Sequence, residues 1–283
     1  MFVRSDHRVR ALAPWLCAAL VLTACGDDFT PPEDLAPKPS EYQPGRVGLV
    51  SLLSGGGGVE ASLYERPDPL APEVRVVEGE CTLYTRPDEG SCVPVCGPGV
   101  CTPANQCVEV PRPASAGVIT VTGLRQGLRF QPRPGGYELD TPPPVELFDP
   151  GASIRVIAAG ADLPAFSAQL SGVPPLEVAF DTITLRGDRA TRLIWTAAGV
   201  GRVSLEISIA RPGAPLSAML LCEADDNGSL TIPATIAGRL RAPLEGEAVR
   251  GTIARLERSV ITTAAGPIEI VAGSRLVVAV EQR

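Results

Sequence analysis

The stretch Arg202-Val203-Ser204-Leu205-Glu206-Ile207-Ser208-Ile209 decides the fold that this sequence predicts. Apolar side chains occupy every second position, and polar side chains occupy the positions between them. Successive side chains of a β-strand point to opposite faces of its sheet. The pattern therefore predicts a half-buried strand with one apolar face and one wet face.

Segments with the same strand character recur on both sides of this stretch, and glycine and proline residues separate them. The predicted strands cover residues 47–51, 59–63, 117–122, 153–159, 177–185, 191–196, 202–209, 216–222, 251–258, 267–271 and 275–281. A helix is predicted only over Ala234–Leu240, which is entered through Pro233. Many short strands without an alternating strand–helix rhythm favour an all-β fold, an antiparallel β-sandwich with immunoglobulin-like layers.

The proline run Pro142-Pro143-Pro144 leaves the number of β units open. It marks either a boundary near residue 142 between two units or a surface crossover inside one, and we favour one body over residues 47–283. Four glycines, Gly55–Gly58, lie between the first two predicted strands and predict a hairpin connection. A phosphate-binding loop is not favoured here, because neither a lysine nor a helix start follows.

The N-terminus has the order of an export signal. Three arginines precede an apolar run over residues 11–24, and small residues stand directly before Cys25. A transmembrane anchor is not favoured, because about 20 apolar residues are needed to span a bilayer core.

The residues Leu22-Thr23-Ala24-Cys25 resemble the lipobox of bacterial lipoproteins. The resemblance implies that residues 1–24 are a signal peptide and that Cys25 becomes the first residue and carries a covalent lipid. An ordinary signal peptide is the alternative. Residues 25–46 are rich in proline and acids and predict a disordered tether. Gly26, rather than Asp27, follows the cysteine, which by analogy with enteric sorting favours the outer membrane of the cell envelope.

Composition excludes several kinds of chemistry. The only histidine of the 283 residues is His7, inside the predicted signal peptide. Without histidine the remaining chain has no Ser-His-Asp or Cys-His catalysis and no histidine metal ligand. The net charge is −7, which gives no electrostatic reason to bind nucleic acid or anionic headgroups. We therefore expect the lipid anchor, not surface charge, to hold the protein at the membrane.

Six cysteines remain besides Cys17 of the predicted signal peptide and the predicted lipidation site Cys25. They are Cys81, Cys92, Cys96, Cys101, Cys107 and Cys222. An even number in an exported chain favours disulfides over zinc. The segment at about 88–110 has too few apolar residues for a core, so we predict a disulfide-rich insertion whose four cysteines pair among themselves. That leaves Cys81 for Cys222, although other pairings are open. The insertion faintly resembles small EGF-like or EB-like cysteine modules.

Some segments also resemble an uncharacterised kind of bacterial lipoprotein β domain. They are residues 147–151, 163–166, Trp195, and the stretch from Cys222 to Pro233. This resemblance implies no activity. Trp195 lies in a predicted strand and is expected in the core or half-buried.

A calcium site is considered at Glu223, Asp225 and Asn227, where oxygen side chains alternate before Gly228. The spacing partly resembles a calcium loop of the EF-hand kind. The twelfth position is Ala234, which cannot supply the final carboxylate, and the flanks predict strands. We favour a hairpin turn at Asn227-Gly228 instead, and no metal or other cofactor is predicted.

Three functions remain open. The first is a lipid-anchored envelope protein with a non-enzymatic structural, adhesion or binding role toward an envelope protein or a glycan. The second is a calcium- or carbohydrate-binding module. The third is a hydrolase that uses carboxylates alone, which needs two acids converging in a cleft. Such a cleft would weaken the first interpretation.

Overall fold

The computed structural model describes residues 45–55, 58–212, 216–240 and 242–283, and all of them belong to one compact unit, Pro37–Arg283. The expected signal peptide 1–24, the lipidation site Cys25 and the expected tether up to residue 44 lie outside the described residues. The described chain is almost entirely β-structure, with one short helix, α1 (Ala234–Arg239). The predicted all-β fold class is confirmed.

The largest sheet has nine strands and forms the centre of this unit. Its order is β2 (Gly58–Leu63), β1 (Gly48–Ser54), β18 (Pro267–Gln282), β17 (Ala248–Thr262), β14 (Arg202–Ala210), β15 (Ala218–Asp225), β4 (Cys81–Thr85) and β3 (Glu73–Glu78), with β12 (Thr182–Leu185) pairing with β18. Strands β1 and β12 run parallel to β18. The other strand pairings of the described residues are antiparallel, as the sequence predicts, and these two are the exceptions.

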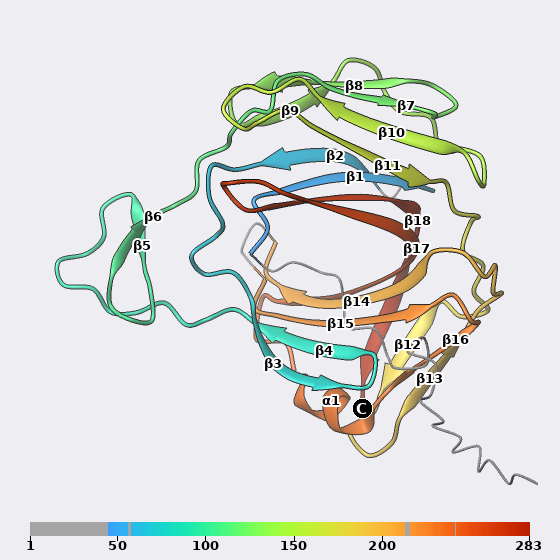
Figure 1. The fold of residues 1–283 in the computed structure, drawn as a ribbon. Helices are drawn as coiled ribbons and strands as arrows, with labels where there is room; N and C mark the ends of the chain where they lie inside the picture. Colours follow the sequence, from blue (N-terminus) through green and yellow to red (C-terminus); the bar gives the residue numbers. More distant parts are fainter. Residues whose placement is uncertain (1–44, 56–57, 213–215, 241) are drawn as a thin grey trace, which may run out of the picture. The chain divides into compact units, whose positions relative to one another are not determined.

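This sheet rolls over on itself around the long β17–β18 hairpin (Figure 1). Leu53 of β1 and Leu221 of β15 line the same cavity, although β18, β17 and β14 separate their strands. The close approach of β17 and β18 depends on Gly273, where a Cβ atom would collide with the carbonyl oxygen of Arg255. The rolled sheet therefore has an inner face around a cavity and an outer face that two further layers cover.

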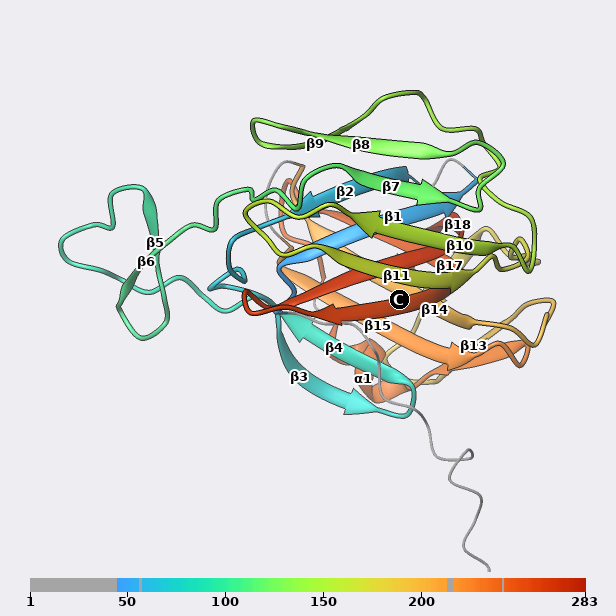
Figure 2. The same cartoon turned by 45° about the horizontal axis from the view of Figure 1, so that its top comes forward.

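A five-stranded sheet forms the first covering layer. Its order is β11 (Phe166–Ser171), β10 (Ser153–Ala158), β7 (Ile119–Thr122), β8 (Leu128–Arg133) and β9 (Gly136–Leu139). Its apolar side chains, such as Phe130 and Val156, form one buried core with Val50 and Ile270 of the large sheet. This pair of facing sheets is the sandwich, and Figure 2 shows the five strands lying over β1, β2 and β18. Residues 142–144 fall between β9 and β10, inside this layer, which fits a crossover.

The second covering layer lies against β14, β15 and β4. It consists of α1, β12, and the two-stranded sheet of β13 (Thr191–Ile194) and β16 (Ser229–Ile232). The alternating residues Val203, Leu205, Ile207 and Ile209 are all buried in this second core, as their spacing predicts. Their apolar face stabilises the layer by roughly 1.5–3 kcal/mol for each fully buried side chain.

The opposite face of β14 differs from the expectation. It was predicted to be wet, yet Ser204 is only 7% exposed, because the rolled sheet encloses this face. The expected hairpin at Asn227-Gly228 is also corrected. The turn exists, with Gly228 at φ +94°, but it sends the chain from β15 into β16, and these two strands do not pair.

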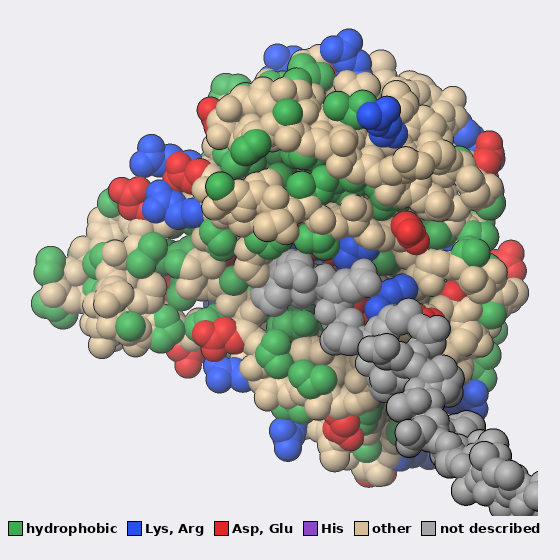
Figure 3. Space-filling view, in the orientation of Figure 1, with side chains coloured by type: hydrophobic (Ala, Val, Ile, Leu, Met, Phe, Trp, Pro, Cys, Tyr) green, Lys and Arg blue, Asp and Glu red, His purple; other side chains and the backbone are tan. Residues whose placement is uncertain are grey.

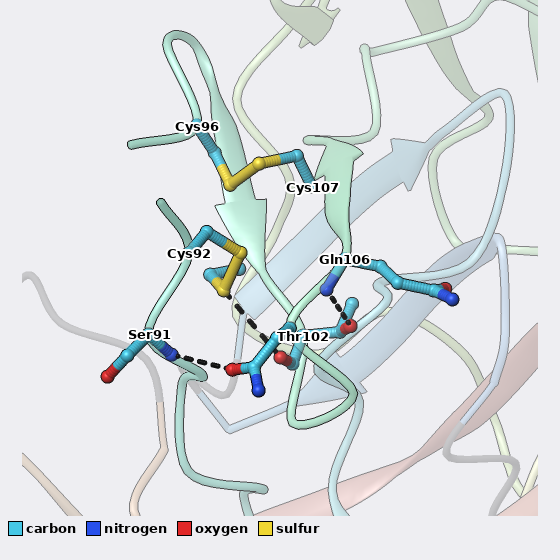
Figure 4. The surroundings of a disulfide bond; sticks show 8 residues. Ser91, Cys92, Cys96, Thr102, Gln106 and Cys107 are labelled. Carbon is cyan, nitrogen blue, oxygen red and sulfur yellow. Dashed lines mark hydrogen bonds between the residues drawn. A yellow bond between two sulfur atoms is a disulfide. The ribbon is translucent and has the colours of Figure 1, made fainter. Parts of the chain in front are cut away.

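The cysteine-rich insertion carries the small hairpin of β5 (Gly99–Cys101) and β6 (Cys107–Glu109). Disulfides Cys92–Cys101 and Cys96–Cys107 hold it, so its four cysteines pair among themselves as expected. Figure 4 shows these bonds with the hydrogen bond from the Ser91 N–H to Asn105 Oδ1. Apolar side chains reach its surface in Figure 3, and Val93 and Val95 are almost fully exposed. Covalent links therefore replace a core in this segment.

The third disulfide joins Cys81 to Cys222, the pair expected from the sequence. The two residues stand directly opposite each other on β4 and β15, at a sequence separation of 141. Both are fully buried in the second core. This bond therefore fixes an early strand to a late strand at the lower part of the rolled sheet in Figure 1.

Candidate functional site

The inner face of the rolled sheet lines a cavity of about 240 Å³, which we call the inner cavity. Its polar lining consists of Arg46, Ser51, Glu60, Ser204, Glu206, Thr252, Arg258, Glu269 and Arg275, and its apolar lining of Leu49, Leu53, Leu221, Ala254, Leu256 and Val271. The cavity reaches the surface near β2, because Glu60 is exposed. One polar space is thus lined by residues from six strands, β1, β2, β14, β15, β17 and β18.

A chain of ion pairs occupies one side of the inner cavity. Arg258 Nη1 lies 2.7 Å from Glu223 Oε1, and Arg258 Nε lies 2.5 Å from Glu269 Oε1. Arg46 donates a further hydrogen bond to Glu269. The side chains of Arg258, Glu223 and Glu269 are at most 5% exposed. These pairs connect β15, β17 and β18 across the roll, and removing one partner would cost about 3–5 kcal/mol.

Glu206 of β14 has a different environment. It faces the inner cavity and forms no hydrogen bond or ion pair with any described residue. Burial raises the pKa of its carboxyl, Arg46 and Arg275 partly oppose this rise, and Glu269 adds to it. Because its side chain stays partly accessible, Glu206 is a desolvated carboxylate that can still meet a ligand.

Two serines add hydroxyl groups without partners to the same cavity. Ser51 and Ser204 are 4% and 7% exposed, and neither hydroxyl bonds to another described residue. Thr252 also lines the cavity and stands directly opposite Glu206 on β17. Buried polar groups in folded proteins are nearly always hydrogen-bonded. Hydroxyl groups of this kind around an unpaired carboxylate are typical of a site that binds a polar ligand.

Arg275 of β18 is the basic counterpart of Glu206. Its Nε atom is buried without a hydrogen-bond partner, and its guanidinium forms no ion pair with any described residue. It influences Glu206 only through space, because its charge, like that of Arg46, opposes part of the rise of the Glu206 pKa. Among the charged groups of the inner cavity, Glu206 and Arg275 therefore face the same space without forming an ion pair with each other.

A second buried charge network lies on the outer side of the rolled sheet. Asp226 accepts hydrogen bonds from Trp195 Nε1 at 2.7 Å and the Ala198 N–H at 2.7 Å, and Arg255 Nε lies 3.1 Å from it. Arg255 also donates to the carbonyl oxygens of Pro175 and Thr196, at 2.6 Å each. Every charge here has a partner, so we assign this network to folding rather than to binding.

Burial alone would raise the pKa of Asp226, but the hydrogen bonds from Trp195, Ala198 and Arg255 outweigh it and lower the pKa. Trp195 is 6% exposed and belongs to the second core, as expected. Sequence reasoning did not single out Asp226. Asp226 directly follows the last residue of β15 and lies in the bend before Gly228, so strand alternation gave no signal for it.

The calcium candidates do not form a ligand set as they stand. Glu223 is buried and paired with Arg258, and Asp225 is exposed. The Asn227 side-chain oxygen accepts a hydrogen bond from the Ser229 N–H at 3.1 Å, which stabilises its own turn. In the described part of the chain, one group of three residues has metal-ligand spacing, Cys92, Cys96 and Cys101, and disulfides engage all three sulfurs.

Other hollows have less chemistry to offer. One of about 550 Å³ lies along β12 and β13, and its charged lining consists of Arg186, Arg189 and Arg192 without an acid. Arg192 donates a hydrogen bond to Ser229. Arg189 and Arg192 are exposed, and Arg186 lies next to the exposed Gly187. The inner cavity is smaller but combines charges of both signs with buried hydroxyl groups, so it is the better candidate.

Comparison with known proteins adds no family: no protein-family model and no curated protein matches the chain. Among the residues that the structure describes, no helix has the length and apolar character needed to cross a membrane. The inner cavity and the sequence of the N-terminus therefore carry the functional argument.

Proposed function

We propose that this protein is a lipid-anchored, non-enzymatic protein of the cell envelope that binds a small polar ligand in the inner cavity. The observation that carries the binding role is the set of Glu206, Ser51 and Ser204, polar groups that face the cavity without partners in the described fold. None of their polar atoms is both fully buried and unpaired, so these groups remain accessible to a ligand in the cavity.

Two observations support the place in the envelope. The residues Leu22-Thr23-Ala24-Cys25 resemble a lipobox, and the body carries three disulfides, which persist in exported proteins. The lipid on Cys25 would hold the body at the outer membrane. The face in Figure 3 shows acidic and basic side chains interspersed among the described residues, which fits attachment by lipid rather than by charge.

A hydrolase that uses carboxylates is the second candidate. The raised pKa of Glu206 is what a general acid needs, and Glu60 and Glu269 line the same cavity. Against this role, Glu269 is committed to two arginines and Glu60 is exposed at the rim. We therefore favour binding. If the purified protein releases any product from glycosides or esters, we expect Glu206→Gln to leave that rate unchanged.

Metabolic labelling with palmitate in the native host tests the anchor. The wild-type chain should incorporate label, and Cys25→Ala should incorporate none, because its sulfur is the acceptor. Cys17→Ala is the matched control, since it removes a cysteine within the predicted signal peptide and should leave labelling unchanged. Labelling that persists in Cys25→Ala would refute the anchor, whatever the cavity binds.

A further inference from the structure

Glu206 and Arg275 carry opposite charges and line the inner cavity from two different strands. Glu206 lies on β14 and Arg275 on β18, with β17 between them. Their strands are thus two spacings of about 4.8 Å apart. The two residues are also offset by two positions along the strands. In the register of the sheet, Arg275 lies in line with Ala254 and Ser204, and Glu206 follows Ser204 by two residues. A direct ion pair does not form, although the charge of Arg275 acts on Glu206 through space.

Hydroxyl groups stand between the two charges. Ser204 precedes Glu206 by two residues and so shares its face of β14, and Thr252 is the direct neighbour of Glu206 on β17. Leu221 and Leu256 add apolar surface to the same lining. A ligand in this space would meet an acceptor at one end, a donor at the other, hydroxyl groups along its length and an apolar wall.

We propose that the inner cavity binds a small zwitterion of the amino-acid class, with its ammonium group at Glu206 and its carboxylate at Arg275. This assignment rests on the proposed binding role and names its ligand. The volume of about 240 Å³ lies below the roughly 300–1,000 Å³ of pockets for drug-sized ligands, which favours a compact molecule.

Charge complementarity disfavours the simpler alternatives. An anion would approach Arg275 but meet the carboxylate of Glu206, and a plain amine would leave the guanidinium without a partner. A neutral sugar would satisfy the hydroxyl groups but leave both desolvated charges unpaired, which costs binding free energy. Only a ligand with both charges satisfies Glu206 and Arg275 together.

Isothermal titration calorimetry on the full chain in detergent tests this assignment at neutral pH. The probes are the standard amino acids one at a time, with propionate and ethylamine as analogues of alanine that each lack one charged group, and glucose as a neutral polyol. We expect saturable binding of at least one amino acid. Propionate, ethylamine and glucose should bind at least about tenfold more weakly, because each leaves a charge unpaired.

Variants locate the binding in the cavity. Glu206→Gln and Arg275→Gln should each weaken amino-acid binding at least about tenfold. Both should remain folded by circular dichroism, because neither residue takes part in an ion pair of the described fold. Glu138→Gln, on an exposed position of β9, is the matched control and should bind like the wild type.

Three outcomes would overturn the assignment: no amino acid binds the folded protein, glucose binds as well as any amino acid, or folded Glu206→Gln binds like the wild type. Glucose binding that depends on Glu206 would refute the zwitterion but leave the cavity as a binding site. No binding by any probe, with Cys25 still labelled by palmitate, would refute the cavity and leave the anchor.

Discussion

At the scale of single residues, the ionised carboxylate of Glu206 is needed for the proposed ligand binding but lowers the stability of the fold. Burial raises its pKa above the ordinary value of 4.5, while Arg46 and Arg275 oppose the rise and Glu269 adds to it. The folded protein therefore binds a proton at Glu206 more tightly than the unfolded chain does. Stability must then fall as the pH rises from 4.5 through the raised pKa.

Glu206→Gln should remove this loss of stability. We expect the variant to have a higher urea midpoint than the wild type at neutral pH, and the two midpoints to converge below pH 4.5, where Glu206 is protonated in both states. Glu138→Gln should show no such pH-dependent gain. A Glu206→Gln variant that is less stable at neutral pH would mean that the carboxylate has a structural partner.

The neighbours Asp225 and Asp226 should respond in opposite ways to the loss of charge. Asp226→Asn leaves Arg255 buried without its counter-charge and should lower the free energy of unfolding by about 3–5 kcal/mol. Asp225 is exposed, so Asp225→Asn should change it by less than about 0.5 kcal/mol. Denaturant unfolding at neutral pH measures both. Equal effects of the two substitutions would contradict the assignment of Asp226 to the buried network.

The pH dependence of Asp226 has the opposite sign from that of Glu206. Its pKa is lowered below the ordinary value of 3.8 in the folded protein. Its contribution to stability is therefore complete above pH 3.8 and is lost as the pH falls through the lowered value. The difference between Asp226→Asn and the wild type should shrink accordingly in strong acid.

At the scale of elements, the alternation of apolar and polar residues predicts a strand where the side chains on both of its faces follow that alternation. Val203 to Ile209 alternate along β14, and the structure buries their apolar face. Strand β3 went unpredicted because a register irregularity between Val74 and Val76 breaks its period. Strand β8 contains Pro132, which usually argues against a strand, but this residue lies beyond the segment that pairs with β7. A local sequence pattern cannot show that a strand will accommodate an irregularity or a proline, because this depends on which residues of the neighbouring strands pair with it.

The helix and the insertion were predictable for local reasons. Pro233 precedes α1 and presets the entry to its first turn, and the cysteines of the insertion are too close in sequence to need the rest of the fold. By contrast, the sequence suggested two strands at residues 267–271 and 275–281, where the structure has the single strand β18. Gly273 interrupted the pattern, and only the close approach of β17 explains why the strand continues through it.

The insertion should unfold by itself when its disulfide Cys92–Cys101 is removed. Replacing Cys92 and Cys101 by alanine should expose residues 88–110 to proteolysis, because exposed residues such as Val93 and Val95 supply no core. The urea midpoint of the body should stay the same. Limited proteolysis followed by mass spectrometry locates the cuts, and cuts inside β14 or β15 would show that the insertion supports the body after all.

At the scale of the whole molecule, the inner cavity could not be predicted from sequence. Its lining combines Arg46 near the start of the body with Arg275 near its end, and only the strand order and the roll bring them together. Alternation did place Ser204 and Glu206 on one face of a strand. It could not show that the rest of the same sheet would enclose that face.

The bond Cys81–Cys222 should stabilise the whole body. Replacing both cysteines by alanine should lower the free energy of unfolding by about 2–5 kcal/mol, because a closure of 141 residues no longer restricts the unfolded chain. Denaturant unfolding without reductant measures the loss. The Cys92 and Cys101 replacement is the matched control, and a loss of the same size there would contradict the different roles assigned to the two bonds.

The most direct test of the ligand cavity is a titration of the Glu206 carboxyl carbon by nuclear magnetic resonance, with and without the amino acid that binds best. The account predicts a raised pKa in the free protein and a clear fall of that pKa when the ammonium group binds beside the carboxylate. A Glu206 pKa that no amino acid changes at saturating concentration would contradict it.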